Sequence, residues 1–437
     1  MPPNASGSGK KFQYCENSPS WNPDAYLADT ELQAHVDALL ASSNDLRGAI
    51  TTSFSLRKTD TYVYHAMVAV TLPQVQQIVG LGSTHGLHDW YFGEEDLNSV
   101  SSGDKQKEEE NIEEGEGDSK QPEQQQVPKA LSPPPHQDVE AYLSIFSPSN
   151  SAPTALRNFA SNAKKASLRN EIGAHLIAKR YIHPSYHSTL NKLPRAKSRP
   201  APSNPYLKFL SWASRNLEWA GPSAASARGR PTSHPVLPIL MHHFGCACPS
   251  HECLEILRLL ANGREVIDVG SGNGYWTRML RDYHAFHASK GKDLPTVTPV
   301  DSAQSAWRAT WIPDTLISDG ATYLRKTRSG AADAVLLLVY PIVGGGIAGG
   351  SEGGFTRGML AAYDGDTVAV VGTQNHNGYT GFRNMTMDEF MEREHDDKWV
   401  KVVQVPLPSF PGKDEALYVY QRGPRAPTKV ASNPVGA

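Results

Sequence analysis

Cysteine is scarce in this 437-residue chain, which contains only Cys15, Cys246, Cys248 and Cys253. Four thiols are too few for the disulfide framework of a secreted domain, so we expect a protein of a reducing compartment. A charge excess of one sign is also missing, because 42 lysines and arginines stand against 45 aspartates and glutamates, for a net charge of −3. Net charge alone therefore indicates neither a polyanionic nor a polycationic partner.

Long apolar runs are missing as well. The most apolar stretch, residues 334–343, is about half as long as a membrane-spanning helix must be. Residues 1–11 contain no apolar core of the kind found in a secretory signal. We expect a cytoplasmic protein, with the nucleus as the alternative, and no membrane partner.

Changes in composition along the chain predict its domain organisation. The stretch from Glu94 to Pro135 is rich in acidic residues, serine, glutamine and proline, and residues 91–120 contain eleven acids against three bases. Such a segment can bury almost nothing, so it is expected to be disordered. The expected order is a disordered N-terminus at 1–19, a mostly helical region at 20–92 and 138–220, the disordered acidic insertion at 93–137, a linker at 221–234, an α/β domain at 235–423 and a disordered tail at 424–437.

Residues 151–230 have the opposite bias, with fourteen lysines and arginines against two acids. Apolar residues from Leu156 to Leu176 recur at helical spacing, so we expect the basic side chains to solvate helices and to balance the acidic insertion. A surface for nucleic acid or another acidic partner is the alternative. We do not favour it, because the aromatic residues of this stretch form no stacking motif.

From Pro235 onward, short β-branched runs alternate with helical segments, which is typical of a parallel sheet covered by helices. Strands are expected at 265–269, 297–301, 315–318, 332–339, 366–372, 399–406 and 416–421. Helices are expected at 250–261, 275–289, 355–362 and 386–398. This order predicts a doubly wound, mostly parallel seven-stranded sheet with a terminal antiparallel hairpin, a Rossmann-like α/β fold.

The most informative motif is the glycine-rich turn after the first of these strands. Asp268 lies near the end of the strand, and Gly270, Ser271, Gly272 and Gly274 lead into the next helix. Glycines permit a tight turn and let a ligand lie against the backbone, while the helix N-terminus offers unpaired N–H groups. Because open α/β sheets bind ligands at the carboxyl ends of their strands, this turn is the predicted cofactor site.

Two nucleotide-type cofactors are compatible with such a turn. A dinucleotide loop, as in an NAD(P)-dependent oxidoreductase, has a glycine where Tyr275 stands here and an apolar residue where Asp268 stands. A carboxylate repels a nearby pyrophosphate, whereas S-adenosylmethionine has a positive ammonium, a positive sulfonium and no phosphate. The residues therefore favour S-adenosylmethionine.

Residues 235–423 resemble the class I S-adenosylmethionine-dependent methyltransferases. The turn from Asp268 to Gly274 matches the first motif of that family, and the expected strand order with its terminal hairpin is similar too. The resemblance implies S-adenosyl-L-methionine as the cofactor. It also implies that Asp301, with the adjacent Ser302, binds the ribose hydroxyls of that cofactor.

Two later segments are similar to further motifs of the family. Asp319, Gly320 and Ala321 resemble the third motif, which implies contact with the adenine. Tyr340 falls where the fourth motif ends beside the transferring methyl group. The Asn/Asp-Pro-Pro-aromatic signature is absent at 339–342, and the double-glutamate loop of arginine methyltransferases is not visible. Base amino groups and arginine are therefore disfavoured as acceptors.

Side chains that could bind a metal or move a proton also occur outside these motifs. Six potential metal ligands gather between His242 and Cys253, but their one-residue spacings suit a tetrahedral zinc site poorly. We expect packed thiols and no metal. His376, in a polar loop after the fifth expected strand, is the candidate base for an acceptor proton.

The sequence as a whole predicts an enzyme that transfers a methyl group to an unidentified acceptor. A small molecule or a protein is favoured over nucleic acid. The alternatives are a non-catalytic interaction protein that retains the fold and, less favoured, the oxidoreductase.

Overall fold

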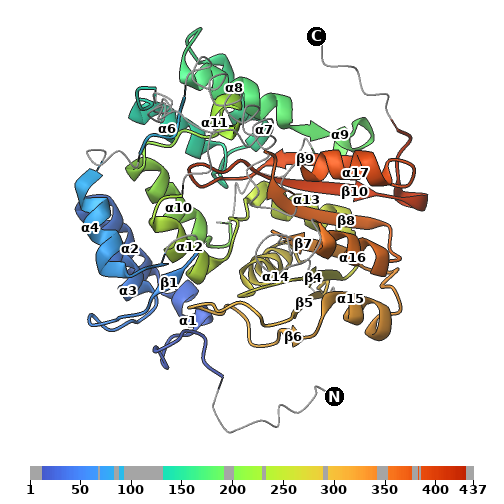
Figure 1. The fold of residues 1–437 in the computed structure, drawn as a ribbon, viewed down its shortest axis with the longest axis horizontal. Coiled ribbons are helices and arrows are strands. Elements are labelled where there is room, and N and C mark those ends of the chain that lie inside the picture. The colour runs from blue at the N-terminus through green and yellow to red at the C-terminus, as the bar shows by residue number, and fades with distance from the viewer. Residues whose placement is uncertain are drawn as a thin grey trace, which may run out of the picture.

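The computed structural model describes residues 12–429 apart from 67–68, 83–87, 93–130, 191–200, 229–232, 289–293, 342–352, 376–381 and 383–384. His376 and most of the expected acidic insertion lie outside the described residues. The helices of the N-terminal region, blue to green in Figure 1, lie to the left of and above a large sheet, most of whose strands belong to the yellow to red part of the chain.

The large sheet has the strand order β3-β9-β10-β8-β7-β4-β5-β6. Its parallel part consists of β4 (Val266–Val269), β5 (Val297–Asp301), β6 (Leu316–Ile317), β7 (Val335–Val339) and β8 (Thr367–Thr373). The terminal hairpin consists of β9 (Val400–Pro406) and β10 (Glu415–Gln421), and β10 lies antiparallel between β8 and β9. The chain runs from β4 to one edge through β5 and β6, then returns to β7 and continues toward the other edge. The predicted doubly wound α/β fold is therefore confirmed.

Helices cover both faces of this sheet, which is why its central strands are buried and mostly apolar. The helices are α13 (His251–Ala261), α14 (Tyr275–His287), the short α15 (Gly320–Thr322), α16 (Gly354–Ala362) and α17 (Met387–His395). Successive strand residues point to opposite faces. Val266 and Leu337 accordingly belong to the apolar cluster that contains α13 and α14, whereas Ile267 and Leu336 belong to the cluster that contains α16 and α17.

An eighth strand extends the predicted seven. β3 (Tyr181–Ile182) comes from the N-terminal region and pairs antiparallel with β9, with Tyr181 opposite Gln404 and Ile182 opposite Val403. The sequence analysis missed this strand because two residues are too few to show a periodic pattern. The pairing covers backbone groups that β9 would otherwise leave at an open sheet edge. It also joins the N-terminal region to the sheet.

The N-terminal region is mostly helical. It contains α1 (Pro23–Ala28), α2 (Thr30–Ser43), α3 (Leu46–Ser53), β1 (Tyr64–His65), β2 (Ala69–Val70), α4 (Leu72–Leu81), α6 (His136–Ser144), α7 (Ala152–Ser161), α8 (Leu168–Lys179), α9 (His187–Leu190), α10 (Pro205–Asn216) and α11 (Ala224–Arg228), and α12 (Val236–Phe244) leads into the sheet. The helical pattern from Leu156 to Leu176 is divided between α7 and α8. The division arises because Ala166 adopts a left-handed φ of +54° and Ser167 caps α8 by accepting the N–H of Asn170. None of the described helices is both long and apolar enough to cross a membrane.

Some segments that were expected to lie outside the packed regions are packed. Cys15 is fully buried and forms a β-bridge to the α/β domain, so the expected disorder of residues 1–19 does not extend to Cys15. The expected linker at 221–234 contains α11. Near the C-terminus, Arg425 pairs with Asp366 at 3.0 Å. The contacts of Cys15 and Arg425 join single residues that are far apart in the sequence. The amino-acid composition of a segment does not indicate such contacts.

A buried hydrogen-bonded pair also connects the N-terminal region to the sheet. His175 Nε2 on α8 lies 2.7 Å from Asp414 Oδ2, next to the start of β10. The two side chains are 7% and 1% exposed. Gln374 donates to the other carboxylate oxygen at 2.8 Å. Asp414 thus depends on partners from two different parts of the chain.

We expect His175→Ala to lower the free energy of unfolding by about 2–4 kcal/mol, because the substitution leaves the buried Asp414 carboxylate without one of its partners. Urea denaturation followed by circular dichroism measures this loss. Arg157→Ala, on the exposed side of α7, is the matched control and should change stability by less than about 0.5 kcal/mol. Equal stabilities of His175→Ala and the unsubstituted protein would show that the pair does not hold the two regions together.

Candidate cofactor site

A cavity of about 410 Å³ lies at the carboxyl ends of β4, β5 and β7. At this point the chain passes from one half of the sheet to the other, which is the usual ligand site of a doubly wound fold. Its lining includes the predicted residues Gly270, Ser271, Gly272, Asp301, Ser302, Asp319, Gly320 and Tyr340. Asp268, Gly274 and Ala321 are not part of the described lining, and His376 lies outside the described residues.

The turn between β4 and α14 has a backbone that few residues can adopt. Gly270, Gly272 and Gly274 have φ angles of +77°, +57° and +77°, in the left-handed region that disfavours side chains. A Cβ atom on Gly274 would lie 2.2 Å from Ile312 Cγ1. A Cβ atom on Gly272 would lie 2.9 Å from Trp307 Cζ2. At Gly270 and Gly272 the cavity wall is therefore bare backbone.

Asp268 supports the turn from beneath. Its side chain is fully buried, and its Oδ2 accepts the hydroxyl hydrogen of Thr277 at 2.7 Å, which ties β4 to the first turn of α14. Burial raises the pKa of Asp268 to about 7, the Thr277 hydrogen bond opposes this rise, and the charge of Asp301 adds to it. The sequence argument placed Asp268 against a positive ligand. The structure places it in the core, where it acts on the turn.

Asp301, at the end of β5, is a carboxylate that does reach the cavity. Its Oδ2 accepts the N–H of Gly272 at 2.9 Å, so the turn and the strand end hold each other in place. Asp319 lies farther along the lining, where it caps α15 by accepting the N–H of Thr322 at 2.8 Å. That hydrogen bond lowers the pKa of Asp319, so this carboxylate is charged at neutral pH.

Aromatic side chains form much of the remaining lining. Trp276 faces the cavity while its Nε1 donates to the carbonyl of Ala247 at 2.8 Å. Tyr340 directly follows β7 and has a φ of +55°. A bulky residue is rare in that backbone region and stays there only where its surroundings hold it. Tyr275 is buried away from the lining, and its hydroxyl donates to Asn204 at 2.8 Å.

One wall of the cavity depends on the N-terminal region, which the sequence analysis missed. Trp307 lines the cavity beside Gly272. The side chain of the next residue, Arg308, is 0% exposed, pairs with Asp60 at 2.7 Å and stacks on the Tyr62 ring at 4.3 Å. Asp60 lies 248 positions away from Arg308 in the sequence. No local pattern could have indicated that contact.

The strand order of residues 235–423 decides the fold. When the strands of this part are numbered along the chain, their order in the sheet is 3-2-1-4-5-7-6, with strand 7 antiparallel to both neighbours. The glycine turn follows strand 1. Residues 235–423 have the class I methyltransferase fold.

Solved methyltransferase structures resemble this chain. A SAM-dependent methyltransferase from Anabaena variabilis matches at 13% identity with a TM-score of 0.27, over 39% of this chain and 82% of its own. The magnesium protoporphyrin IX methyltransferase of Synechocystis, solved with bound SAM, matches at 11% identity with a TM-score of 0.27, over 39% of this chain and 76% of its own. The 1,6-didemethyltoxoflavin-N1-methyltransferase of Burkholderia thailandensis matches at 14% identity with the same TM-score and the same coverage. No protein-family profile and no curated protein matches the chain.

The histidines and cysteines that precede the glycine turn take part in packing. His242 Nδ1 lies 3.0 Å from the Tyr62 hydroxyl, and His243 Nε2 lies 2.9 Å from the Tyr64 hydroxyl. Burial lowers the pKa of both imidazoles and raises the pKa of the Cys253 thiol to about 12. Within the described ranges, no group of three potential ligands is arranged to hold a metal ion.

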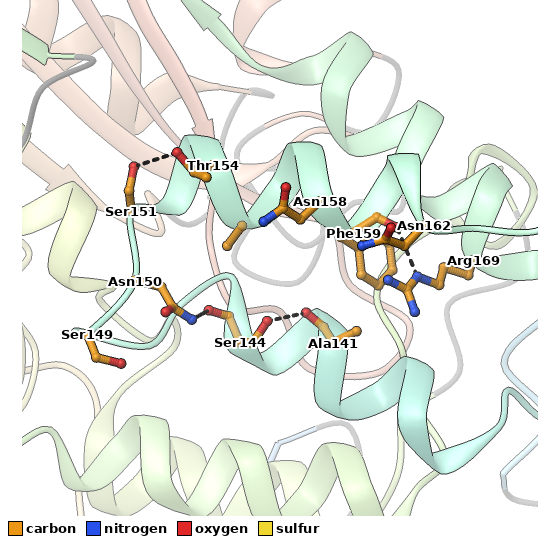
Figure 2. Close-up of a pocket in the computed structure, with 11 residues that line it drawn as sticks. Ala141, Ser144, Ser149, Asn150, Ser151, Thr154, Asn158, Phe159, Asn162 and Arg169 are labelled. Atoms are coloured by element: carbon orange, nitrogen blue, oxygen red, sulfur yellow. Dashed lines mark hydrogen bonds between the residues drawn. The ribbon is translucent and has the colours of Figure 1, made fainter.

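A second cavity of about 430 Å³ lies outside the methyltransferase fold, between α6 and α7 (Figure 2). Hydroxyl and amide side chains form most of its lining, with Arg169 at one end. Arg169 pairs with Asp138 at 3.1 Å and donates to the carbonyl of Phe159 at 2.9 Å. The described lining contains no carboxylate, histidine or cysteine, so we assign no proton-transfer chemistry to it.

Two glycines of the turn between β4 and α14 form a matched pair for substitution. We expect Gly274→Ala to lower the free energy of unfolding by about 3–5 kcal/mol, because the left-handed backbone and the clash with Ile312 add. Gly270→Ala has the same φ, but its Cβ would meet nothing closer than Phe355 Cζ at 3.6 Å, so we expect a loss of about 1–2 kcal/mol. Urea denaturation measures both losses. Equal losses of stability in the two variants would show that the close contact with Ile312 adds no cost.

The buried carboxyl of Asp268 gives the fold a pH dependence of defined sign. Its pKa of about 7 lies above the ordinary 3.8, so its contribution to stability is fully present below about pH 4 and is lost as the pH rises to 7. Asp268→Asn removes this titration. We expect the stability of the unsubstituted protein relative to Asp268→Asn to fall by about 2–4 kcal/mol between pH 4 and pH 7. Urea titrations at both pH values measure the change, and a pH-independent difference would contradict the raised pKa.

Proposed function

We propose that this protein transfers a methyl group from S-adenosyl-L-methionine to an acceptor. The cavity at the ends of β4, β5 and β7 carries the proposal, because bare backbone forms one wall and Asp301 lies beside it. The Gly272 N–H holds the Asp301 carboxylate in one orientation. A carboxylate held in this way can accept hydrogen bonds from the two hydroxyls of a ribose.

The charge of the lining supports this cofactor over a dinucleotide. Asp301 and Asp319 are the charged residues of the described lining, which contains no lysine or arginine. A pyrophosphate would face two carboxylates with no cation, whereas a ligand with an ammonium and a sulfonium would be attracted. The cavity volume of about 410 Å³ also falls within the range of roughly 300–1,000 Å³ that is usual for small-molecule sites.

The main contribution of the protein to methyl transfer would be to align the methyl donor with the acceptor. When bound, the cofactor would supply an electrophilic methyl group on positive sulfur, and the sulfur would leave as the neutral thioether of S-adenosylhomocysteine. Correct alignment can contribute on the order of 7–11 kcal/mol of barrier reduction. Residues 270–273 and Asp301 would hold the nucleoside part. Trp276 and Tyr340 line the cavity, and an aromatic ring face can stabilise a cation by roughly 0.5–2 kcal/mol. His376 stays the predicted base for an acceptor proton.

We favour a small molecule or a protein as the acceptor over nucleic acid. Part of the basic charge of the N-terminal region is neutralised inside the fold, where Arg169 pairs with Asp138 and Arg180 pairs with Glu252 at 2.5 Å. Guanidinium groups that are paired in this way contribute little to the binding of a phosphate backbone. A non-catalytic binder is the second candidate, because Tyr340 departs from the acceptor signatures known for this position in the family.

Calorimetric titration tests the cofactor. We expect S-adenosylhomocysteine to bind with a Kd of about micromolar order and NADH not to bind. Gly272→Arg fills the turn beside Trp307 and should abolish binding. Asp301→Asn should weaken binding by about 10- to 100-fold, because a neutral amide is the poorer acceptor. Micromolar binding of NADH in place of S-adenosylhomocysteine would contradict the proposal.

Label transfer then separates an enzyme from a binder. We expect the unsubstituted protein, but not Gly272→Arg, to transfer tritium from methyl-labelled S-adenosylmethionine into a cell extract. Fractionation into protein, nucleic acid and small molecules identifies the acceptor class. Equal labelling by both proteins would show that the activity comes from elsewhere. Intact S-adenosylhomocysteine binding without labelling would favour the non-catalytic binder.

A further inference from the structure

A buried charged side chain that no sequence motif indicates lies behind one end of the cavity. Lys413 belongs to the loop between β9 and β10, and its side chain is 2% exposed. Its Nζ lies 4.6 Å from the centroid of the Tyr340 ring and donates to the carbonyl of Cys246 at 3.3 Å. Tyr340 and Cys246 both line the cavity. Lys413 therefore contacts two residues of the cavity wall without being part of the lining itself.

Glu415 is the acidic partner of this lysine. Its Oε1 lies 3.4 Å from Lys413 Nζ, and its side chain is 3% exposed. Burial raises the pKa of Glu415, and the charge of Lys413 opposes the rise. A buried charge is costly unless it is paired and hydrogen-bonded, and removing one partner of such a pair is strongly destabilising. The two side chains thus depend on each other.

Lys413 places its ammonium group against two residues of the cavity wall, Cys246 and Tyr340. Burial raises the pKa of the Cys246 thiol to about 11, and Lys413 lowers this pKa more strongly than Glu415 raises it. At Cys246 the positive charge of the pair therefore outweighs its negative charge. Tyr340 has a backbone φ of +55°. Its N–H donates to the carbonyl of Val371 at 2.8 Å, which fixes the backbone but leaves the ring to be held by its neighbours.

We propose that Lys413 is a positioning residue of the methyl-transfer end of the cavity, where it holds the Tyr340 ring and places a fixed positive charge behind it. This proposal rests on the proposed function, which assigns Tyr340 to that end. A positive charge behind the ring disfavours the positive sulfonium of S-adenosylmethionine relative to the neutral thioether of S-adenosylhomocysteine. The ring face also attracts a second cation less when an ammonium already lies against it. Lys413 therefore raises the affinity of the site for S-adenosylhomocysteine relative to its affinity for S-adenosylmethionine.

Calorimetric titration of both ligands measures this preference as the ratio of the two Kd values. The double variant Lys413→Met/Glu415→Gln removes both charges at nearly constant side-chain volume, so neither group is left buried and unpaired. We expect it to bind S-adenosylmethionine about three- to tenfold more favourably, relative to S-adenosylhomocysteine, than the unsubstituted protein does. Lys413→Arg keeps the charge and should leave the ratio within about twofold.

Glu415→Gln alone provides a second measurement with the opposite sign. The lysine charge is then less compensated. We expect S-adenosylhomocysteine to bind more favourably, relative to S-adenosylmethionine, than it does to the unsubstituted protein. An unchanged ratio in a folded double variant, or in Glu415→Gln where the double variant does not fold, would overturn the proposal. An equal change in Lys413→Arg and the double variant would also overturn it, because shape and not charge would then be responsible. Failure of the unsubstituted protein to bind either ligand would instead overturn the proposed function.

Discussion

The bend between β4 and α14 is the constraint on which the cavity depends. Three of its residues have positive φ angles within a stretch of five, so the chain can turn there only with glycine at Gly270, Gly272 and Gly274. The contacts that hold the bend include the Asp268–Thr277 hydrogen bond beneath it and the Asp301 carboxylate that accepts the Gly272 N–H. Because these contacts come from β4, α14 and β5, the shape of the wall follows from the sheet order itself.

The N-terminal region is part of this architecture and not an appendage to it. It adds β3 to the edge of the sheet, and it supplies the Asp60 that fixes Arg308 next to the cavity residue Trp307. Further along, His175 reaches the carboxylate of Asp414, which belongs to the same loop as Lys413. The helical region therefore packs against the neighbour of a cavity residue and against the loop that contains Lys413.

The sequence indicated the elements whose signal is local. β5 has the predicted bounds, and the other predicted strands lie within a few residues of the observed ones, because buried parallel strands form continuous apolar runs. The glycine turn and Asp301 were found for the same reason, since their residues stand at fixed offsets from a strand. The two-residue β3 and the division between α7 and α8 have no such signal. Trp307 and Lys413 were missed because their importance comes from partners distant in the sequence.

The charge argument for the cofactor was first placed on the wrong residue. The sequence argument against a dinucleotide used repulsion between a pyrophosphate and Asp268. In the structure Asp268 is fully buried with a pKa of about 7, so it is partly protonated at neutral pH and contributes little repulsion in the cavity. The charge argument belongs to Asp301 and Asp319, which are both part of the lining. Asp268 thus relates to the geometry of the turn. Asp301 and Asp319 relate to the charge of the ligand that the cavity can accept.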